Sequence, residues 1–340
     1  MSTKLSMDAN KKTAEPGIKN PRQGPRKASS RLSRREAIEG YLCIAPWLLG
    51  FAVFTLGPMI FSFLISLSKW DMINPPQFVG TANYAAILTD DFRFRQSLKV
   101  TALYAALSLP IGMIASLSVA MLLNMQVRGM RIFRSIYYVP AILPGAAVAM
   151  LWQWILKPQG GILNYLLTRH VVPSVDGGFH WASLVQNPPN WLSDPNWALP
   201  SFVIMSLWAV GGGMIIYLAG LQSVPTQLYE SAEIDGAGPW TKFRAITLPM
   251  ISPTIFFNLI MGIIGSFQVF TSSYIITPGG GPGYATLFYV LYLYQKAFKY
   301  LQMGYASALA WILFAIVLAL TLIVFRTSAK WVYYEAEVKN

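Results

Sequence analysis

The chain alternates between long stretches without charged side chains and short stretches that contain them. Asp, Glu, Lys and Arg are all absent from residues 40–68, 100–127, 135–156, 195–229, 245–295 and 300–325. A helix crosses the bilayer core with about 20 apolar residues, so each stretch can hold at least one crossing. A helix also satisfies its own backbone hydrogen bonds in lipid. The pattern therefore predicts an all-α integral membrane protein.

The number of crossings depends on the stretch 245–295, which is long enough for two. Residues 278–283 read Pro-Gly-Gly-Gly-Pro-Gly and should break any helix. The remainder, 284–295, has only about half the length of a crossing, so we interpret it as interfacial or partly re-entrant. We therefore expect six transmembrane helices, at about 41–68, 100–125, 135–156, 199–222, 251–277 and 304–325.

The basic residues predict the orientation of these helices. Of the 26 Lys and Arg residues, 18 lie on the side that holds both termini and the loop 225–249, while Lys69 and Lys99 stand at span ends on the other side. The positive-inside rule places the more basic side in the cytoplasm. We expect a basic, disordered cytoplasmic tail at 1–38 that acts as a topology anchor, a transmembrane domain at 39–328 and a cytoplasmic end at 329–340.

Composition argues against several other classes of protein. A hydrophobic fraction of 54% with 12% charged residues is typical of integral membrane proteins. The net charge of +12 could suggest nucleic-acid binding, but ten of the basic residues lie in the tail between Lys4 and Arg35. Metal ligands are scarce, and we expect no metal site. His170 and His180 fit surface residues of the outer loop 157–194, whose functional alternative is a docking surface for a binding protein.

The loop 225–249 is a charged island between two charge-free stretches. It holds Glu230, Glu233 and Asp235, three of the 14 acidic residues. Pro225 suits the first turn of a short helix, and Gly236 suits the left-handed position just past its end. The loop should therefore contain a helix, a turn and a second helix.

The second helix should begin at Pro239 and close at Pro249, because a proline forces the preceding Leu248 out of the helical region. Trp240, Phe243 and Ile246 recur at near-helical spacing and give this helix an apolar side. An apolar side so close to the membrane surface requires something to bury it. An ordinary amphipathic loop is the simpler alternative.

The order of residues in this loop resembles the EAA loop of bacterial ABC importer permeases. The matching segments are Glu230-Ser231-Ala232, Asp235-Gly236-Ala237 and Ile246-Thr247-Leu248-Pro249. Ser231 departs from the family, which usually has a second alanine, and Gly238-Pro239 replaces a small or polar pair. In that family the loop is a cytoplasmic coupling helix that docks on an ATPase. The resemblance implies that coupling is carried by Glu230, Ser231, Ala232, Asp235, Gly236, Ala237, Phe243, Leu248 and Pro249.

A second segment resembles the first permease subunit of maltose-type carbohydrate importers. It is the run Pro278-Gly279-Gly280-Gly281-Pro282 with the aromatic residues that follow. The resemblance implies a type I importer fold in the bacterial cytoplasmic membrane and a transport subunit that is not an enzyme. It also implies the partners: a second homologous permease, two copies of an ATPase that binds ATP and Mg, and an extracytoplasmic sugar-binding protein. The chain itself has no Walker A motif and should bind no cofactor.

The substrate path should be polar but uncharged, because the predicted spans contain no ionisable residue for an ion or proton relay. A neutral sugar suits such a path, with hydroxyls for amides and C–H faces for aromatic rings. We expect Gln268 and Thr271 to share one helix side. Each candidate could instead bond only to a neighbouring helix. The candidates are Trp208, Gly212, Tyr217, Asn258, Ser266, Gln268 and Thr271.

Three rival functions remain open at this point. A glycerol 3-phosphate or polyol permease would need a basic residue in the cavity, and the spans offer none. A secondary sugar carrier would need an ion-binding polar cluster, and a membrane enzyme would need a catalytic constellation. The sequence does not indicate which sugar is carried.

Overall fold

The computed structural model describes residues 30–125, 127–168, 170–173, 179–182 and 188–333. The chain divides into two units, residues 1–59 and residues 60–340. Residues 1–29 of the expected tail and residues 334–340 of the expected C-terminal end lie outside the described residues.

The first unit contains a helix that begins earlier than expected. α1 spans Ser30–Phe51, and a π-helical turn, η1, spans Ala52–Leu56. Residues 30–38 are therefore helical rather than disordered. The reason is local, because Arg and Glu are good helix formers and Arg35 Nε pairs with Glu39 Oε1 one turn later at 2.9 Å. α2, Gly57–Ser66, continues into the second unit.

Most long helices follow the charge-free stretches. α4 spans Phe92–Leu123, α13 spans Ser252–Phe267 and α16 spans Met303–Ser328. α8 (Pro195–Ser206) and α9 (Val210–Gln222) are joined by the single 3-10 turn η2, Leu207–Ala209. In the described residues, five helical stretches are long and apolar enough to cross a membrane, and six if one bent pair counts as a crossing.

The third expected span is bent. α5 (Met130–Ile142) and α6 (Gly145–Ile155) meet at 96°, so residues 135–156 belong to two helices joined at a sharp bend rather than to one continuous helix. Pro144 is the cause, because a proline excludes the preceding residue from the helical region. Leu143 accordingly has an extended ψ of 143°. Each half is too short to cross a bilayer alone.

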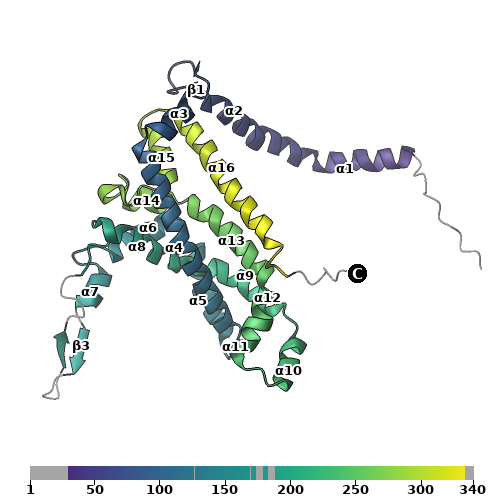
Figure 1. The fold of residues 1–340 in the computed structure, drawn as a ribbon, viewed down its shortest axis with the longest axis vertical. Helices are drawn as coiled ribbons and strands as arrows, with labels where there is room; N and C mark the ends of the chain where they lie inside the picture. Colours follow the sequence, from purple (N-terminus) through teal and green to yellow (C-terminus); the bar gives the residue numbers. More distant parts are fainter. Residues whose placement is uncertain (1–29, 126, 169, 174–178, 183–187, 334–340) are drawn as a thin grey trace, which may run out of the picture. The chain divides into compact units, whose positions relative to one another are not determined.

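Two buried clusters hold the second unit together. α4 packs against α9 and α13, and α13 packs against α16, so these helices lie side by side in Figure 1. One cluster joins Ala120 and Leu123 of α4 to Met214 and Tyr217 of α9 and to Ile251. The larger cluster gathers around fully buried Tyr289 and Tyr292. Close packing of such large side chains stabilises the unit through many van der Waals contacts.

Shorter elements connect the long helices. β1 (Ser68–Lys69) pairs with β2 (Gln77–Phe78), and β3 (His170–Pro173) pairs with β4 (Phe179–Ala182), both antiparallel. Outside the loop 225–249, the remaining short helices are α3 (Ala82–Thr89), α7 (Ile162–Thr168), α14 (Thr271–Ile276), η4 (Pro282–Tyr284), α15 (Tyr289–Tyr294) and η5 (Gln295–Lys299). The helix break at 278–283 is confirmed, since Gly280, Gly281 and Gly283 all have positive φ.

Candidate functional site

The charged loop begins with a short helix that ends in a defined cap. α10 spans Thr226–Ile234, preceded by Pro225 in an extended conformation rather than in the first turn. Gly236 has φ of +75°. Its N–H donates to the Glu233 carbonyl at 3.0 Å, and the Ala237 N–H donates to the Ala232 carbonyl at 2.8 Å. This is a Schellman cap, and the predicted left-handed glycine is confirmed.

The second helix of the loop does not close where we expected. α11 begins at Pro239 and runs to Lys242, followed by the π-helical turn η3 (Phe243–Thr247) and α12 (Leu248–Met250). Leu248 is helical, with φ of −63° and ψ of −44°. The expectation that Leu248 leaves the helix and that Pro249 ends it is therefore wrong.

The wider turn explains how a proline is tolerated there. A proline in a regular helix lacks an N–H and clashes with the carbonyl four residues earlier. In η3 the Leu248 N–H donates to the Phe243 carbonyl, five residues back. A π turn rearranges the backbone before Pro249, so the helix continues almost into α13. The second half of the loop is thus a nearly continuous extension of α13.

Two side-chain contacts connect the two halves of the loop. Lys242 Nζ donates to Glu233 Oε1 at 2.7 Å, and the Tyr229 hydroxyl lies 2.9 Å from Thr247 Oγ1. The Lys242 hydrogen bond lowers the pKa of Glu233. This contact is present above the ordinary carboxyl pKa and is lost as the pH falls through the lowered value. Near neutral pH the Glu233 carboxylate is therefore charged and paired with Lys242.

The outer side of the loop presents unpaired acids and apolar groups together. Within the described part of the chain, the side chains of Glu230 and Asp235 are exposed and make no hydrogen bond or ion pair. Ile234 is 88% exposed and Trp240 is 71% exposed, with Trp240 stacked on Phe243 at 5.5 Å. An exposed mixture of this kind is typical of surfaces that contact another protein or a membrane.

The inner side of the loop is bound to the transmembrane helices. Tyr229, Ile246 and Met250 pack against the cluster that joins α4, α9 and Ile251. The loop is therefore in packed contact with residues of α4 and α9 and with Ile251, which precedes α13. The remaining expected coupling residues differ in exposure: Ser231, Leu248 and Pro249 are exposed, and Ala232, Ala237 and Phe243 are half-buried.

The predicted path residues fall around two neighbouring cavities. The first, of about 430 Å³, lies between α4, α9 and α13, and Tyr217, Asn258 and Ser266 line it. The second, of about 330 Å³, lies between α5, α6, η2 and α14, and Trp208 and Thr271 line it. Tyr104, Ser206, Ala209 and Val269 border both cavities. The structure thus places five of the seven candidates at cavities.

The other two candidates line neither cavity. Gly212 faces α5, where an added Cβ would lie 4.0 Å from the Ala141 Cβ. Gln268 is exposed, and the helix breaks between it and Thr271, since Phe270 has φ of −135° and ψ of −62°. Gln268 and Thr271 therefore do not share one helix side. The Phe270 ring packs on Tyr274 and Tyr294, at centroid distances of 5.3 and 5.0 Å, and this aromatic packing accompanies the break.

Trp152 of α6 is a candidate that sequence reasoning missed. It lines the second cavity and meets Trp208 edge to face, with ring centroids 5.8 Å apart. Its Nε1 is buried and has no hydrogen-bond partner among the described residues. A buried N–H without a partner is costly. The sequence signal that could have pointed to Trp152 is its position as a tryptophan in the charge-free stretch 135–156.

Comparison with known proteins places these features in a family. The family model described as "Binding-protein-dependent transport system inner membrane component" matches residues 108–334. The chain is 41% identical to the probable ABC transporter permease protein YesP of Bacillus subtilis, over 91% of this chain and 96% of that protein. It is 34% identical to the trehalose/maltose transport system permease protein MalF of Thermococcus litoralis, over 87% of this chain and 95% of that protein.

A solved structure shares the fold. It is a bacterial ABC transporter involved in the import of the acidic polysaccharide alginate, matched with a TM-score of 0.73. The match covers 88% of this chain and 99% of that chain at 24% identity. The cavities and the charged loop therefore lie in an importer permease fold.

Proposed function

The chain belongs to the family of inner membrane components of binding-protein-dependent transport systems, and from this we propose that it is the permease subunit of an ATP-driven saccharide importer. The single observation that carries the proposal is the loop 225–249, whose outer side is exposed and whose inner side packs on α4, α9 and α13. A partner that binds the outer side of the loop can therefore cause a conformational change in the helices that line both cavities.

In the proposed mechanism a cytoplasmic ATPase supplies the energy. Glu230 makes a polar contact with the ATPase, and Gly236 sets the turn between the two short helices. Reversing a conformational equilibrium from 1:99 to 99:1 requires about 5.5 kcal/mol of differential binding. Closure of an ATPase on ATP and Mg can provide it. The chain is a transport subunit, and ATP is hydrolysed by the separate ATPase subunit.

The proposed assembly has four further members. Two copies of the ATPase bind the ATP and Mg, a second homologous permease completes the path, and an extracytoplasmic binding protein delivers the substrate. The inner-membrane family description supports the location, and the basic residues support an orientation with both termini in the cytoplasm. The Pro278–Pro282 run supports the first-permease subtype of the maltose-type group.

The cavities favour a neutral saccharide as the substrate. Trp152, Trp208 and Tyr104 offer ring faces, while Asn258, Ser206 and Thr271 offer polar groups. None of the residues that line the two cavities is Asp, Glu, Lys or Arg. A phosphorylated polyol would need a basic partner there, and a secondary carrier would need a charged relay. The named relatives support the saccharide class, since one is a trehalose/maltose permease protein.

The function is tested by uptake in proteoliposomes that contain the complex, with ATP inside and binding protein outside, using labelled neutral saccharides. We expect uptake that requires ATP. Replacing Trp152 with phenylalanine should raise the KM for uptake about fivefold and leave the kcat nearly unchanged, because part of the indole surface that lines the second cavity is lost, an effect of about 1 kcal/mol.

The matched control is Trp154→Phe on the same helix. Trp154 is exposed and lines neither cavity. The KM for uptake by the Trp154→Phe variant should therefore stay at the native value. Uptake driven by an ion gradient without ATP would contradict the importer function. An unchanged KM in Trp152→Phe would instead remove only the assignment of the second cavity to the path.

A further inference from the structure

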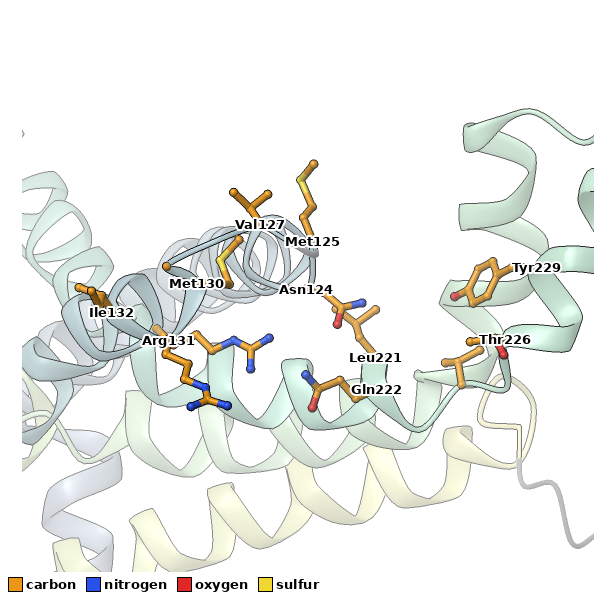
Figure 2. A pocket seen from close by; sticks show the side chains of 13 residues that line it. Asn124, Met125, Val127, Met130, Arg131, Ile132, Leu221, Gln222, Thr226 and Tyr229 are labelled. Carbon is orange, nitrogen blue, oxygen red and sulfur yellow. The ribbon is translucent and has the colours of Figure 1, made fainter.

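A third cavity lies beside the charged loop, away from the two path cavities. It measures about 870 Å³ and is formed by the end of α4, the start of α5, the end of α9 and the start of α10. Figure 2 shows Arg131 at one side of it, Asn124 and Gln222 in the middle, and Thr226 and Tyr229 at the other side. We propose that this cavity binds the phosphate headgroup of an anionic membrane lipid.

The charge of the cavity favours an anion. Arg131 and Arg134 line it, and none of the lining residues is acidic. Arg134 is partly occupied, because its Nε and Nη2 donate to the Leu123 carbonyl at 3.3 and 3.0 Å and so cap α4. Arg131 is exposed, and its guanidinium makes no hydrogen bond or ion pair within the described chain. A guanidinium without a partner is suited to a phosphate.

Further donors surround the two guanidinium groups. The side chains of Asn124, Gln222 and Thr226 line the cavity and are exposed, and in the described residues none of them makes a side-chain hydrogen bond. Amide and hydroxyl groups can donate to the non-bridging oxygens of a phosphodiester while the arginines balance its charge. The set therefore matches the headgroup of a phospholipid.

The position of the cavity favours a lipid over a soluble phosphate. It lies where two membrane-crossing helices end, at Leu123 and Gln222, and thus at the depth of the headgroups. Met125, Val127 and Ile132 also line it and are 57%, 56% and 67% exposed. An apolar rim around a basic centre suits a molecule that carries both acyl chains and a phosphate.

A lipid bound in this cavity would restrict the movement of the charged loop. Thr226 and Tyr229 belong to α10, whereas Asn124 caps the end of α4 and Met130 and Arg131 begin α5. One bound headgroup would therefore join the first turn of the loop to a neighbouring pair of helices. An anionic lipid should then stabilise one position of the loop relative to the transmembrane helices.

The test measures lipid retention by native mass spectrometry. The full chain, in the complex in which it is purified, is equilibrated in nanodiscs containing equal amounts of phosphatidylglycerol and phosphatidylcholine. We expect preferential retention of phosphatidylglycerol, and about fivefold weaker retention in Arg131→Gln, the factor that corresponds to about 1 kcal/mol for one basic residue at a membrane surface. Nanodiscs expose both leaflets, so the result does not depend on orientation.

The control is Arg128→Gln, which removes an exposed arginine of the same connection that does not line the cavity and should retain lipid as the native chain does. Gln222→Glu provides a second test at an exposed site, since a carboxylate in the cavity should repel phosphate. Equal retention in the native chain and both cavity variants would overturn the proposal. Displacement of the lipid by inorganic phosphate alone, without preference for phosphatidylglycerol, would also overturn it by indicating a soluble anion site.

Discussion

Replacing Glu230 with lysine is expected to abolish the ATP hydrolysis that binding protein and saccharide stimulate in the assembled complex. Glu230 is exposed on α10 and has no partner within the described chain, so its charge is available to another subunit. Reversing a charge inside a protein interface costs several kcal/mol. A loss of about 3 kcal/mol corresponds to a fall of roughly 100-fold in the fraction of coupled complex.

The control for this prediction is Asp90→Lys. Asp90 is also exposed and lies at the end of α3, outside the charged loop, so it receives the same change in charge without a role in coupling. Stimulated hydrolysis should remain at the native level in that variant. Full stimulation and uptake in Glu230→Lys, with all subunits still assembled, would show that Glu230 does not couple the loop to an ATPase.

Replacing Gly211 with alanine is expected to destabilise the transmembrane domain by about 3 kcal/mol, the upper part of the usual range for overpacking. Gly211 lies at the start of α9, where it meets α5. An added Cβ would lie 2.1 Å from the Tyr137 carbonyl oxygen and 3.0 Å from the Tyr138 Cα. Both are backbone atoms, so α5 and α9 would have to separate.

Gly212→Ala is a close control, because it makes the same chemical change one residue later. There the added Cβ would meet only the Ala141 Cβ at 4.0 Å, an ordinary contact. Thermal denaturation of the purified complex should show a clearly lower melting temperature for Gly211→Ala and little change in melting temperature for Gly212→Ala. Equal melting temperatures for the two variants would mean that α5 and α9 do not approach as closely as the structure has them.

Much of the architecture could be predicted because membrane insertion depends on simple local properties. Charge-free stretches located the long helices, and the glycine run at 279–281 located a break that the backbone confirms. The left-handed Gly236 was predictable for the same reason, since a positive φ strongly favours glycine. Each of these features follows from the residues of a short local segment, without reference to other parts of the fold.

The errors arose where neighbouring elements decide the geometry. Pro249 does not end its helix because the π turn before it rearranges the hydrogen bonds, and the sequence carries no plain signal for such a turn. The break before Thr271 accompanies the packing of Phe270 on Tyr294, which is distant in sequence. Trp152 was missed because its importance depends on a cavity that α6 forms with α5, η2 and α14.

The most direct test of the central claim is to identify what touches the outer side of the charged loop. A photoreactive benzoylphenylalanine is placed at Ile234, which is 88% exposed, and in a separate variant at Leu88 of α3, which is 60% exposed. After irradiation of the purified, ATP-hydrolysing complex, we expect the Ile234 probe to form an adduct with the nucleotide-binding subunit and the Leu88 probe to form none. Absence of that adduct at Ile234, or equal adducts at both positions, would contradict the claim that this loop is the contact through which ATP hydrolysis drives transport.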